Sequence, residues 1–556
     1  MIKKLKLKFG AAIGVPAEEI NITPMTVFVG PNNSGKSKLL SEISGYCNLG
    51  VNHGEVEILD QMSFAPLNVE EVERAISKAI RKPRHDETIV ENHVFIESQG
   101  RRYLVPLCSL RAALLDPSSA PQHFCAWYLA THTLYLGGGN RITLLNSSNA
   151  GDLQQEAKTS LQTLFRDDEK RHEVRRIVAE AFGSHFVIDP TNMGSLRVCW
   201  SANPPIDDRE ERGFHAEAVD FHSKGKPVND VSDGMKAFTG IIAEVIAGDP
   251  RVILIDEPEA FLHPSLASRL GHELSRAAQS AGKNVLVSTH SAAFVMGCIQ
   301  SGTPISIVRL TYKNEVATAR VLPSDEIIQL MRNPLLRSTG VLNGLFYEFV
   351  VVTEADTDRA FYQEINERLL KYKPEWGIPN CLFVNAQNKQ TVRIIVQPLR
   401  QLGIPAAGIV DIDIVKDGGN VWTNLLKSAG VPDMLHQSFA TTRIAVKQAM
   451  EASGKDMKRD GGISILEKKD KEAAQNLLDQ LESYGIFVVP GGELECWLKQ
   501  LGATSDGATW LVSIFERMGE NPDSPDYLKP AENDVWQFLS HLKEWFADQN
   551  RKGIPT

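Results

Sequence analysis

The sequence predicts an α/β protein made of two successive domains, each built on parallel strands. Three observations support this prediction: short apolar segments end in a glycine, an acid or a serine, helical patterns separate them, and the series starts again near residue 345. The chain has 556 residues, which is more than one hydrophobic core normally accommodates. At least two domains are therefore expected.

The composition excludes several classes of protein. Hydrophobic residues make up 42% of the chain and charged residues 23%, which is typical of a globular protein and not of a collagen-like or disordered one. The formal net charge is −10, so the chain as a whole lacks the basic character of a protein that coats nucleic acid. Any contact with DNA must therefore be local or assisted by metal ions.

The cysteines and the apolar segments bear on the compartment. Seven cysteines are scattered singly without a CxxC pair, and we expect them to be buried thiols in a reducing compartment. The basic start, MIKKLKLKFG, alternates like a half-buried strand and no signal-peptide core follows it. No segment approaches the roughly 20 apolar residues of a membrane helix. These features predict a cytoplasmic protein with no membrane partner.

The first apolar segment, 25–29, leads into a segment that matches the phosphate-binding pattern GxxxxGK[ST]. In such a loop, backbone N–H groups and a helix N-terminus bind phosphate oxygens, the lysine reaches the β and γ phosphates, and the serine ligates Mg²⁺. The alternative is a chance glycine-rich turn. The predicted ATP-binding residues are Gly30, Asn32, Asn33, Ser34, Gly35, Lys36 and Ser37, of which Ser37 is also a metal ligand.

Two later strands complete this site. Segment 252–255 runs into Asp256 and Glu257, so Asp256 would hold Mg²⁺ while Glu257 orients the attacking water. Segment 285–287 leads to His290, which is placed to touch the γ phosphate. Glu257 and His290 are therefore the predicted catalytic residues of this site. The alternatives are an ordinary acidic turn and a structural histidine.

More than 200 residues separate the first two strands and lack their rhythm. We expect an inserted lobe at about 55–225 within an ATPase domain that covers 1–340. A charged helical tract is expected at 154–181. Basic clusters in the lobe are candidates for DNA contact, the alternative being solvated faces; they lie at 81–84, 101–102 and 170–176.

The segments GPNNSGKS, ILIDEPEAFLHP and VSTHS resemble the ATP-binding-cassette (ABC) ATPases of the DNA-repair and overcoming-lysogenization-defect (OLD) type. The resemblance implies a signature segment at 231–235, although its aspartate and methionine depart from the transporter pattern. Ser232 and Gly234 would then face ATP bound by a second subunit in a head-to-tail dimer. The alternative is that Ser232 only caps a helix. Gln61 is the candidate for the glutamine that links Mg²⁺ to the lobe.

After Pro334 a second α/β alternation covers about 345–500, with strands expected at 349–352, 381–384, 407–410 and 486–489. Three of these strands are followed by acids. Carboxylates at the carboxyl ends of neighbouring parallel strands repel one another unless hard cations neutralise them, so the pattern predicts a Mg²⁺ or Mn²⁺ site. Two such ions can promote phosphodiester cleavage. The acids are Glu354, Asp358, Asp411, Asp413 and Glu495.

These acids resemble the motifs of the Toprim fold found in topoisomerases, primases and OLD nucleases. The resemblance implies that all five are metal ligands and that Glu354 is also a catalytic acid/base group. It further implies that Lys499 neutralises a phosphate. Ala355 stands where OLD nucleases usually have glycine. The alternative is therefore a Toprim-like domain that is retained as an interaction module without catalysis.

Together the motifs predict an ABC-type P-loop ATPase head with an inserted lobe, a Toprim-like α/β domain, and a helical tail at 501–556. This combination resembles OLD proteins and related bacterial anti-phage ATPases, namely the large subunit of the Gabija system and the ATPase of Septu or retron-linked systems. It implies an ATP-regulated, metal-dependent DNA endonuclease that uses ATP and Mg²⁺, with Mn²⁺ as an alternative at the Toprim site. It also implies self-association through the ATPase heads, as a dimer or larger oligomer.

A second function from another class is an ATPase sensor that holds and releases a separate effector nuclease or toxin. A chromosome-organising ATPase is disfavoured because the sequence has no long heptad array.

Overall fold

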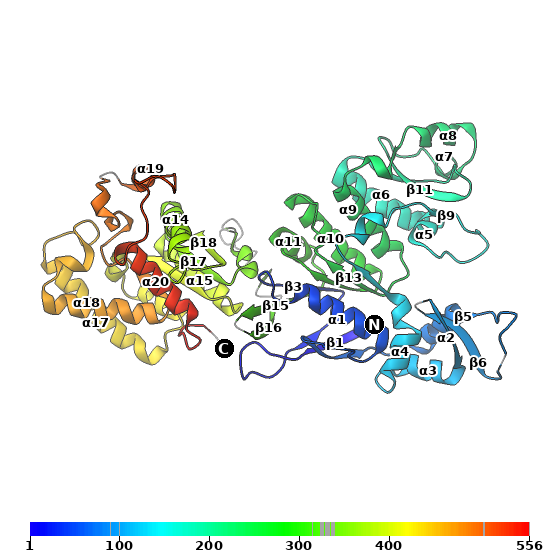
Figure 1. The fold of residues 1–556 in the computed structure, drawn as a ribbon, viewed down its shortest axis with the longest axis horizontal. Coiled ribbons are helices and arrows are strands. Elements are labelled where there is room, and N and C mark those ends of the chain that lie inside the picture. The colour runs from blue at the N-terminus through cyan, green and yellow to red at the C-terminus, as the bar shows by residue number, and fades with distance from the viewer. Residues whose placement is uncertain are drawn as a thin grey trace. The chain divides into compact units, whose positions relative to one another are not determined.

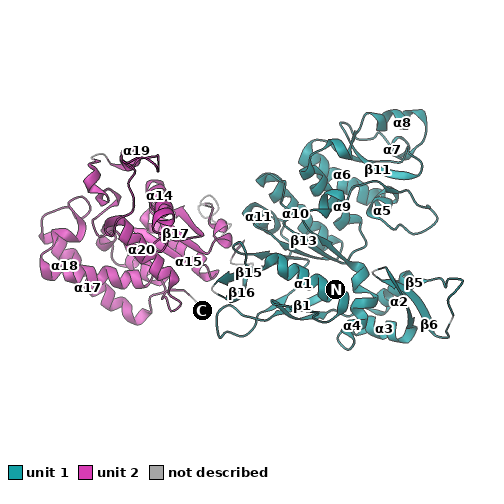
Figure 2. Cartoon of the chain, in the orientation of Figure 1, with its two compact units in different colours: residues 1–325 teal, residues 326–556 magenta. Residues whose placement is uncertain are grey.

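The computed structural model describes residues 1–88, 90–98, 100–313, 315–322, 327–328, 334, 340–503 and 506–554. Both halves of the chain combine helices with strands (Figure 1), which confirms the predicted α/β class. The chain forms two compact units, residues 1–325 and 326–556 (Figure 2). The finer domain boundaries at 340, 345 and 500 stay a prediction.

The first unit is built on a six-stranded sheet with the strand order β16-β15-β3-β14-β13-β8. All neighbours in it are parallel except β16, which is antiparallel to β15. Every residue of β3 and β14 is buried, as expected for central strands covered on both faces. The strands are β3 (Met25–Val29), β8 (Thr133–Leu136), β13 (Val252–Asp256), β14 (Asn284–Ser288), β15 (Ile305–Lys313) and β16 (Val316–Leu322).

Helix α1 (Lys36–Leu49) covers one face of this sheet, together with a small antiparallel sheet of order β2-β1-β4. Phe28, Leu39 and Leu254 belong to the core formed on this side. Helices α9 (Asp233–Ala247), α10 (Pro264–Ser280) and α11 (Ala292–Gln300) form the opposite layer (Figure 1). The small sheet consists of β1 (Ile2–Leu7), β2 (Glu19–Asn21) and β4 (Leu59–Phe64).

The structure divides the segment expected to be a single lobe at 55–225. Strand β4 pairs with β1, and β8 returns to the central sheet, where it pairs with β13. Figure 1 accordingly shows two separate groups of elements, one around α2 and α3 and one around α6 and α8. Strand β8 has only four residues, Thr-Leu-Tyr-Leu, which is too short for a periodic signal.

The first group contains α2 (Val69–Ala79), β5 (Ile80–Arg81), β6 (His93–Ser98), β7 (Arg101–Pro106), α3 (Leu107–Leu115), α4 (Pro121–Trp127) and η1 (Leu129–His132). After β8 and η2 (Asn140–Thr143), the second group contains β9 (Ser148–Asn149), α5 (Ser160–Arg166), α6 (Asp168–Phe182), β10 (His185–Asp189), β11 (Ser195–Ser201), α7 (Asp208–Arg212), α8 (Ala216–Ser223), β12 (Lys226–Pro227) and η3 (Val228–Asp230). The charged tract at 154–181 is interrupted because Asp167 ends α5 and caps α6.

The second unit has a four-stranded parallel sheet of order β18-β17-β19-β20. Its strands are β17 (Phe349–Thr353), β18 (Cys381–Asn385), β19 (Ala406–Val410) and β20 (Ile486–Val488). Its helices are α14 (Asp356–Tyr372), α15 (Lys389–Gln401), α16 (Asn420–Ser428), α17 (Asp433–Ala452), α18 (Lys468–Ser483), α19 (Gly507–Met518) and α20 (Asp534–Ala547). Short 3₁₀ turns are η4 (Val341–Phe346), η5 (Ile412–Lys416), η6 (Gly462–Ile465), η7 (Leu494–Cys496) and η8 (Lys499–Leu501).

The tail after residue 500 contributes to the core of the second unit. Trp510 of α19 and Trp536 of α20 are each 1% exposed and belong to the same buried cluster as Phe349 and Phe487 of the sheet. The aromatic residues of α20 have the helical spacing that the sequence indicates. The second unit therefore depends on these two helices to cover one face of its sheet.

Two further expectations concern burial and membranes. Four cysteines are buried, but Cys108 on the first turn of α3 is exposed, so the expectation of buried thiols is wrong for this residue. Among the described residues, no helix combines the length and the apolar character that crossing a membrane requires.

We predict that Trp536→Ala destabilises the second unit by about 3–5 kcal/mol, because it removes a large buried side chain and leaves a cavity. Hydrogen exchange of peptides from β17 and α14 in the full chain measures this loss. Val512→Ala on α19, where the side chain is 60% exposed, is the matched control. It should change the free energy of unfolding obtained from the exchange by less than about 0.5 kcal/mol. Equal protection in the two variants would contradict the role assigned to α20.

Candidate active sites

The predicted phosphate-binding loop connects β3 to α1 at the carboxyl edge of the central sheet. Gly30, Asn33 and Gly35 have φ values of 144°, 61° and 91°, a region that favours glycine and tolerates asparagine. A Cβ atom at Gly30 would overlap the carbonyl oxygen of Leu310, and one at Gly35 would come within 2.7 Å of Ile58. The two glycines are thus required by both conformation and space, and the loop curls over the helix N-terminus.

Lys36 lies inside this loop. Its Nζ donates to the carbonyl oxygens of Gly30 at 2.9 Å and Pro31 at 2.8 Å, and contacts Ser34 Oγ at 3.3 Å. Burial lowers the pKa of Lys36 to about 8, and the carboxylates of Glu257 and Asp256 oppose that shift. The ammonium group is therefore held at the loop, where phosphate oxygens would replace the carbonyl oxygens as its partners.

Ser37 and Asp256 come together as the sequence predicts. Ser37 Oγ donates to Asp256 Oδ1 at 2.9 Å, and the Ser288 hydroxyl donates to the same oxygen. A hydroxyl and a carboxylate side by side beside a phosphate loop fit Mg²⁺, which prefers oxygen ligands. These two residues would hold that ion.

The predicted catalytic pair also lies together. His290 Nε2 is 3.6 Å from Glu257 Oε1, and Glu257 has a left-handed backbone with a φ of 52°. Burial, and then the charge of Lys36, lower the pKa of His290 below its usual value, so its imidazole is neutral near pH 7. A neutral imidazole beside a carboxylate at a strand end can help to position a water molecule.

Two further residues of this site were not predicted from the sequence. Glu259 accepts hydrogen bonds from Thr289 Oγ1 and the His290 N–H, each at 2.8 Å, and so fixes the segment that carries His290. Arg141 is 3% exposed and donates to the carbonyl oxygen of Glu257. Glu259 was visible in the motif EPE, whereas Arg141 follows β8 and has no sequence signal linking it to the site.

The residues assigned to the signature segment lie elsewhere in the unit. Ser232 caps α9, where its Oγ accepts from the Met235 N–H at 3.3 Å, and its side chain is exposed. Gly234 packs against the loop after β13, because a Cβ there would come within 2.5 Å of the Phe261 carbonyl oxygen. Gln61 is exposed on β4, opposite Lys6 of β1. The structure thus shows the helix cap, and the roles of Ser232, Gly234 and Gln61 toward ATP stay predictions.

In the second unit, Glu354, Asp411 and Asp413 converge. Each can offer a carboxylate oxygen such that the three oxygens lie within 4.8 Å of one another. Glu354 follows β17 and Asp411 follows the adjacent parallel strand β19, so the sheet itself brings them together. The Asp411 N–H donates to Glu354 Oε1 at 2.9 Å.

The electrostatics of this cluster reflect crowded acids. Burial, followed by the charge of Asp411, raises the pKa of Glu354 to about 8 and that of Asp358 to about 7. Burial also raises the pKa of Asp411. Asp413 Oδ1 is buried and has no hydrogen-bond partner among the described residues. A divalent cation would reduce the repulsion between the carboxylates and give Asp413 Oδ1 a partner, so the donor set fits Mg²⁺ or Mn²⁺.

Asp358 and Glu495 lie beside the cluster without completing it. The Asp358 carboxylate accepts from the Ala355 N–H at 3.1 Å, and Glu495 Oε1 accepts from the Gly507 N–H at 2.8 Å. Both are near enough to influence the charge state of the cluster. Lys499, the predicted phosphate ligand, is exposed on η8. Their predicted roles as ligands stay untested.

Two lysines that were not predicted from the sequence pair with acids of the cluster. Lys458 Nζ lies 2.8 Å from Asp411 Oδ2 and 3.7 Å from Glu493 Oε2, and Lys389 Nζ lies 3.1 Å from Asp413 Oδ2. Burial opposes the charge of Lys458, but the bond to Asp411 outweighs it and keeps the pKa of Lys458 above its usual value. The Lys458 side chain is half-buried, because the acid cluster attracts its ammonium group.

Comparisons with known proteins agree with the nucleotide site. Residues 168–296 match the family model described as "AAA domain, putative AbiEii toxin, Type IV TA system", which includes β13 and β14. The chain is 24% identical over 267 residues to the Old nuclease of Escherichia phage P2, which covers 44% of this chain and 42% of that protein. It is 27% identical over 173 residues to the phosphonates import ATP-binding protein PhnC of Lactobacillus gasseri, covering 28% of this chain and 65% of the relative.

Two solved structures that align with part of the chain are SMC head domains. The SMC head domain from Thermotoga maritima aligns with 58% of this chain and 99% of its own, at 13% identity and a TM-score of 0.30. The SmcHead bound to the C-winged helix domain of ScpA aligns with 59% of this chain and 99% of its own, at 13% identity and a TM-score of 0.32.

These findings confirm the predicted resemblance to an OLD-type ABC ATPase, and they show that the chain carries an ATPase domain. The chain spans less than half of the Old nuclease that it matches.

We predict that Mn²⁺ without nucleotide raises the melting temperature of the full chain, because the ion binds the folded acid cluster and not the unfolded chain. A metal concentration about 100 times the Kd would stabilise the second unit by roughly 2.7 kcal/mol. Asp413→Asn should remove most of this shift, whereas the exposed control Asp470→Asn should keep it. The same shift in both variants, measured by scanning fluorimetry, would place the ion elsewhere.

Proposed function

We propose that this OLD-type ABC ATPase is an ATP-regulated, metal-dependent DNA endonuclease of bacterial anti-phage defence, acting in the cytoplasm. The observation that carries the proposal is the convergence of Glu354, Asp411 and Asp413 at the ends of two adjacent parallel strands, in a chain that also holds a phosphate loop. The similarity to the phage P2 Old nuclease supports it. We assign the two activities to two domains, the ATPase to 1–340 and the Toprim-like domain to 345–500.

In the first unit, the backbone of the loop and Lys36 would bind the phosphates of ATP. Ser37 and Asp256, already joined by a hydrogen bond, would hold Mg²⁺. Glu257 would accept a proton from the attacking water while neutral His290 orients it. Arg141 fixes the backbone of Glu257 and thereby its position relative to the loop.

In the second unit, Glu354, Asp411 and Asp413 would hold Mg²⁺ or Mn²⁺. A bound divalent ion would supply an activated water and charge stabilisation for the leaving oxygen of a phosphodiester. Glu354, at the end of β17 and within the cluster, is also placed to exchange a proton with water. Asp358 and Glu495 would adjust the charge of the cluster from its margin.

Self-association and DNA binding belong to the proposal. The exposed Ser232 at the start of α9 is available to a second subunit, as a dimer of ATPase heads would require. The basic clusters of the first unit are weak candidates for DNA contact, because Arg102 is paired with Glu87 and Arg176 with Glu173. DNA would therefore be held mainly near the acid cluster, through cations.

A specific observation favours the second candidate function, a sensor that holds a separate effector. Lys458 and Lys389 already pair with Asp411 and Asp413, so the acids can be neutralised without a metal. Ala355 also departs from the glycine usual in OLD nucleases. A Toprim-like unit stabilised by its own lysines could serve as a binding module, regulated by ATP in the first unit.

We predict that Lys36→Ala reduces ATP hydrolysis on the order of 10²–10³-fold, because it removes the main positive charge at the β and γ phosphates. Phosphate release by the purified chain measures the change. Lys38→Ala is the matched control, since Lys38 is exposed on the same helix and pairs with Glu57. Unchanged turnover in Lys36→Ala would refute the assignment of the phosphate loop.

We predict that the purified chain nicks supercoiled plasmid DNA with Mg²⁺ or Mn²⁺, and that Asp411→Asn reduces nicking on the order of 100-fold or more through lost metal binding. Asp470→Asn should cut as the wild type does. Asp411→Asn should also leave ATP turnover intact. A wild-type chain that hydrolyses ATP but never cleaves DNA would favour the sensor.

A further inference from the structure

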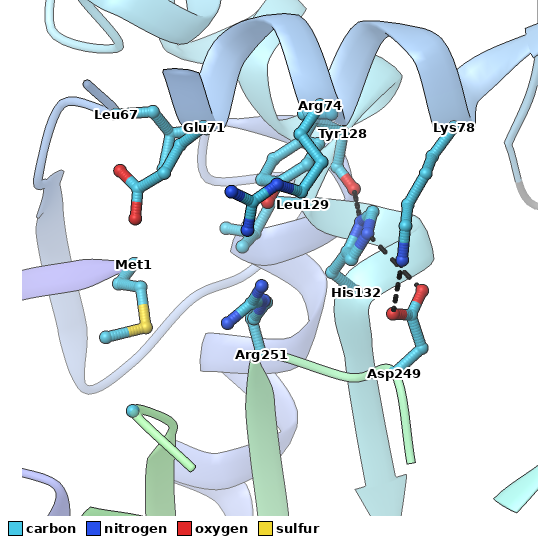
Figure 3. Close-up of a pocket in the computed structure, with 12 residues that line it drawn as sticks. Met1, Leu67, Glu71, Arg74, Lys78, Tyr128, Leu129, His132, Asp249 and Arg251 are labelled. Atoms are coloured by element: carbon cyan, nitrogen blue, oxygen red, sulfur yellow. Dashed lines mark hydrogen bonds and ion pairs between the residues drawn. The ribbon is translucent and has the colours of Figure 1, made fainter. Parts of the chain in front are cut away.

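A cavity of about 240 Å³ lies at the amino-terminal edge of the central sheet in the first unit (Figure 3). Its floor is the start of β13 and β8, where the Arg251 N–H donates to the His132 carbonyl oxygen at 2.7 Å. Helix α2 forms the opposite wall and contributes Arg74 and Lys78. The phosphate loop follows β3 at the carboxyl edge of the same sheet, so this cavity is separate from the nucleotide site.

The positive charges in this cavity exceed the negative ones. Figure 3 shows the guanidinium groups of Arg74 and Arg251 pointing toward one another from opposite walls. Among the described residues, neither guanidinium has a hydrogen bond or an ion pair to a carboxylate. Both arginines are exposed, so water screens part of the repulsion between them, and an anion bound between them would meet donors from both sides.

The acids of the cavity are already engaged. Asp249 lies 3.9 Å from Lys78 Nζ and 3.7 Å from His132 Nε2. The Glu71 carboxylate accepts from the Asn68 N–H at 3.0 Å as part of a helix cap. Burial lowers the pKa of His132, so its ring adds no charge near pH 7. Neither carboxylate forms an ion pair with Arg74 or Arg251 among the described residues, so both guanidinium groups keep donors that an added anion can use.

The remaining walls are apolar. Leu67, Ala75 and Leu129 line the cavity together with Tyr128, whose ring stacks on His132 at 4.3 Å. The volume is below the roughly 300–1,000 Å³ of sites for drug-sized ligands. A ligand would therefore be small and would combine a strongly anionic group with a short planar or apolar part.

We propose that this cavity binds a small phosphorylated molecule, no larger than a nucleoside monophosphate, whose phosphoryl group is gripped between Arg74 and Arg251. Each planar guanidinium presents parallel N–H groups that match phosphate oxygens in a bidentate manner. The apolar wall around Tyr128 contacts the remainder of the molecule. Strand β13 joins the two sites, with Arg251 before its first residue and Asp256 as its last.

Calorimetric titration of the full chain tests this site, in the Lys36→Ala background so that the phosphate loop contributes equally to every sample. Inorganic pyrophosphate probes the phosphoryl chemistry alone, and AMP adds a planar base. Arg251→Gln and Arg74→Gln should each weaken binding at least about tenfold through the lost charge-assisted hydrogen bonds. Arg251→Lys keeps the positive charge but loses the two parallel N–H groups, so its affinity should lie between those of the parent and Arg251→Gln. Arg276→Gln, at an exposed arginine of α10, is the matched control and should bind as the parent does.

If AMP binds more tightly than pyrophosphate, the natural ligand carries a base. If pyrophosphate binds more tightly, the natural ligand is a phosphate without a base. Either result supports the site. Parent-like affinity in Arg251→Gln and Arg74→Gln for both probes would overturn it. So would a parent chain that binds neither probe at about 1 mM, a concentration that detects even weak sites. Circular dichroism of each variant shows whether a loss reflects the site and not the fold.

Discussion

Carboxylates meet at the carboxyl ends of parallel strands in both units, and the repulsion between them constrains everything arranged around the two sites. In the first unit these acids are Asp256, Glu257 and Glu259 at the end of β13. In the second they are Glu354, Asp411 and Asp413 after β17 and β19. Parallel strands force such side chains onto one edge, so each unit must supply positive charge or hydrogen-bond donors there.

The two units meet this requirement differently. In the first, Lys36 belongs to the phosphate loop itself, and hydroxyls of Ser37 and Ser288 satisfy Asp256. In the second, the charges come from segments outside the acidic motifs, Lys389 at the start of α15 and Lys458 before η6. In the first unit, an anionic ligand could therefore replace the carbonyl oxygens that now accept hydrogen bonds from Lys36. The second holds an acid-rich cluster in which a cation and the lysines would share the same carboxylates.

The residues of each site that lie close together in the sequence could be predicted from it. The loop from Gly30 to Ser37 is recognisable because one turn and one helix N-terminus impose its pattern, and Asp411 and Asp413 because they follow one strand. Arg141, Lys389 and Lys458 escaped prediction because they reach their partners through tertiary contacts, 116, 24 and 47 residues away in the chain. Strand β8 was not predicted because four residues are too few to show a periodic pattern. Its pairing with β13 divides the segment that was expected to be one insertion.

The position of β3 has a consequence for how the protein is made. β3 ends at Val29, yet its two neighbours in the sheet, β14 and β15, begin at Asn284 and Ile305. At about 5–20 residues per second, a ribosome needs roughly 10–50 s to deliver the first of these partners. Throughout that interval the residues of β3 lack both of their neighbours in the sheet, and strands with unpaired edges can pair with other chains. The central sheet of the first unit can therefore form only after most of that unit has been synthesised.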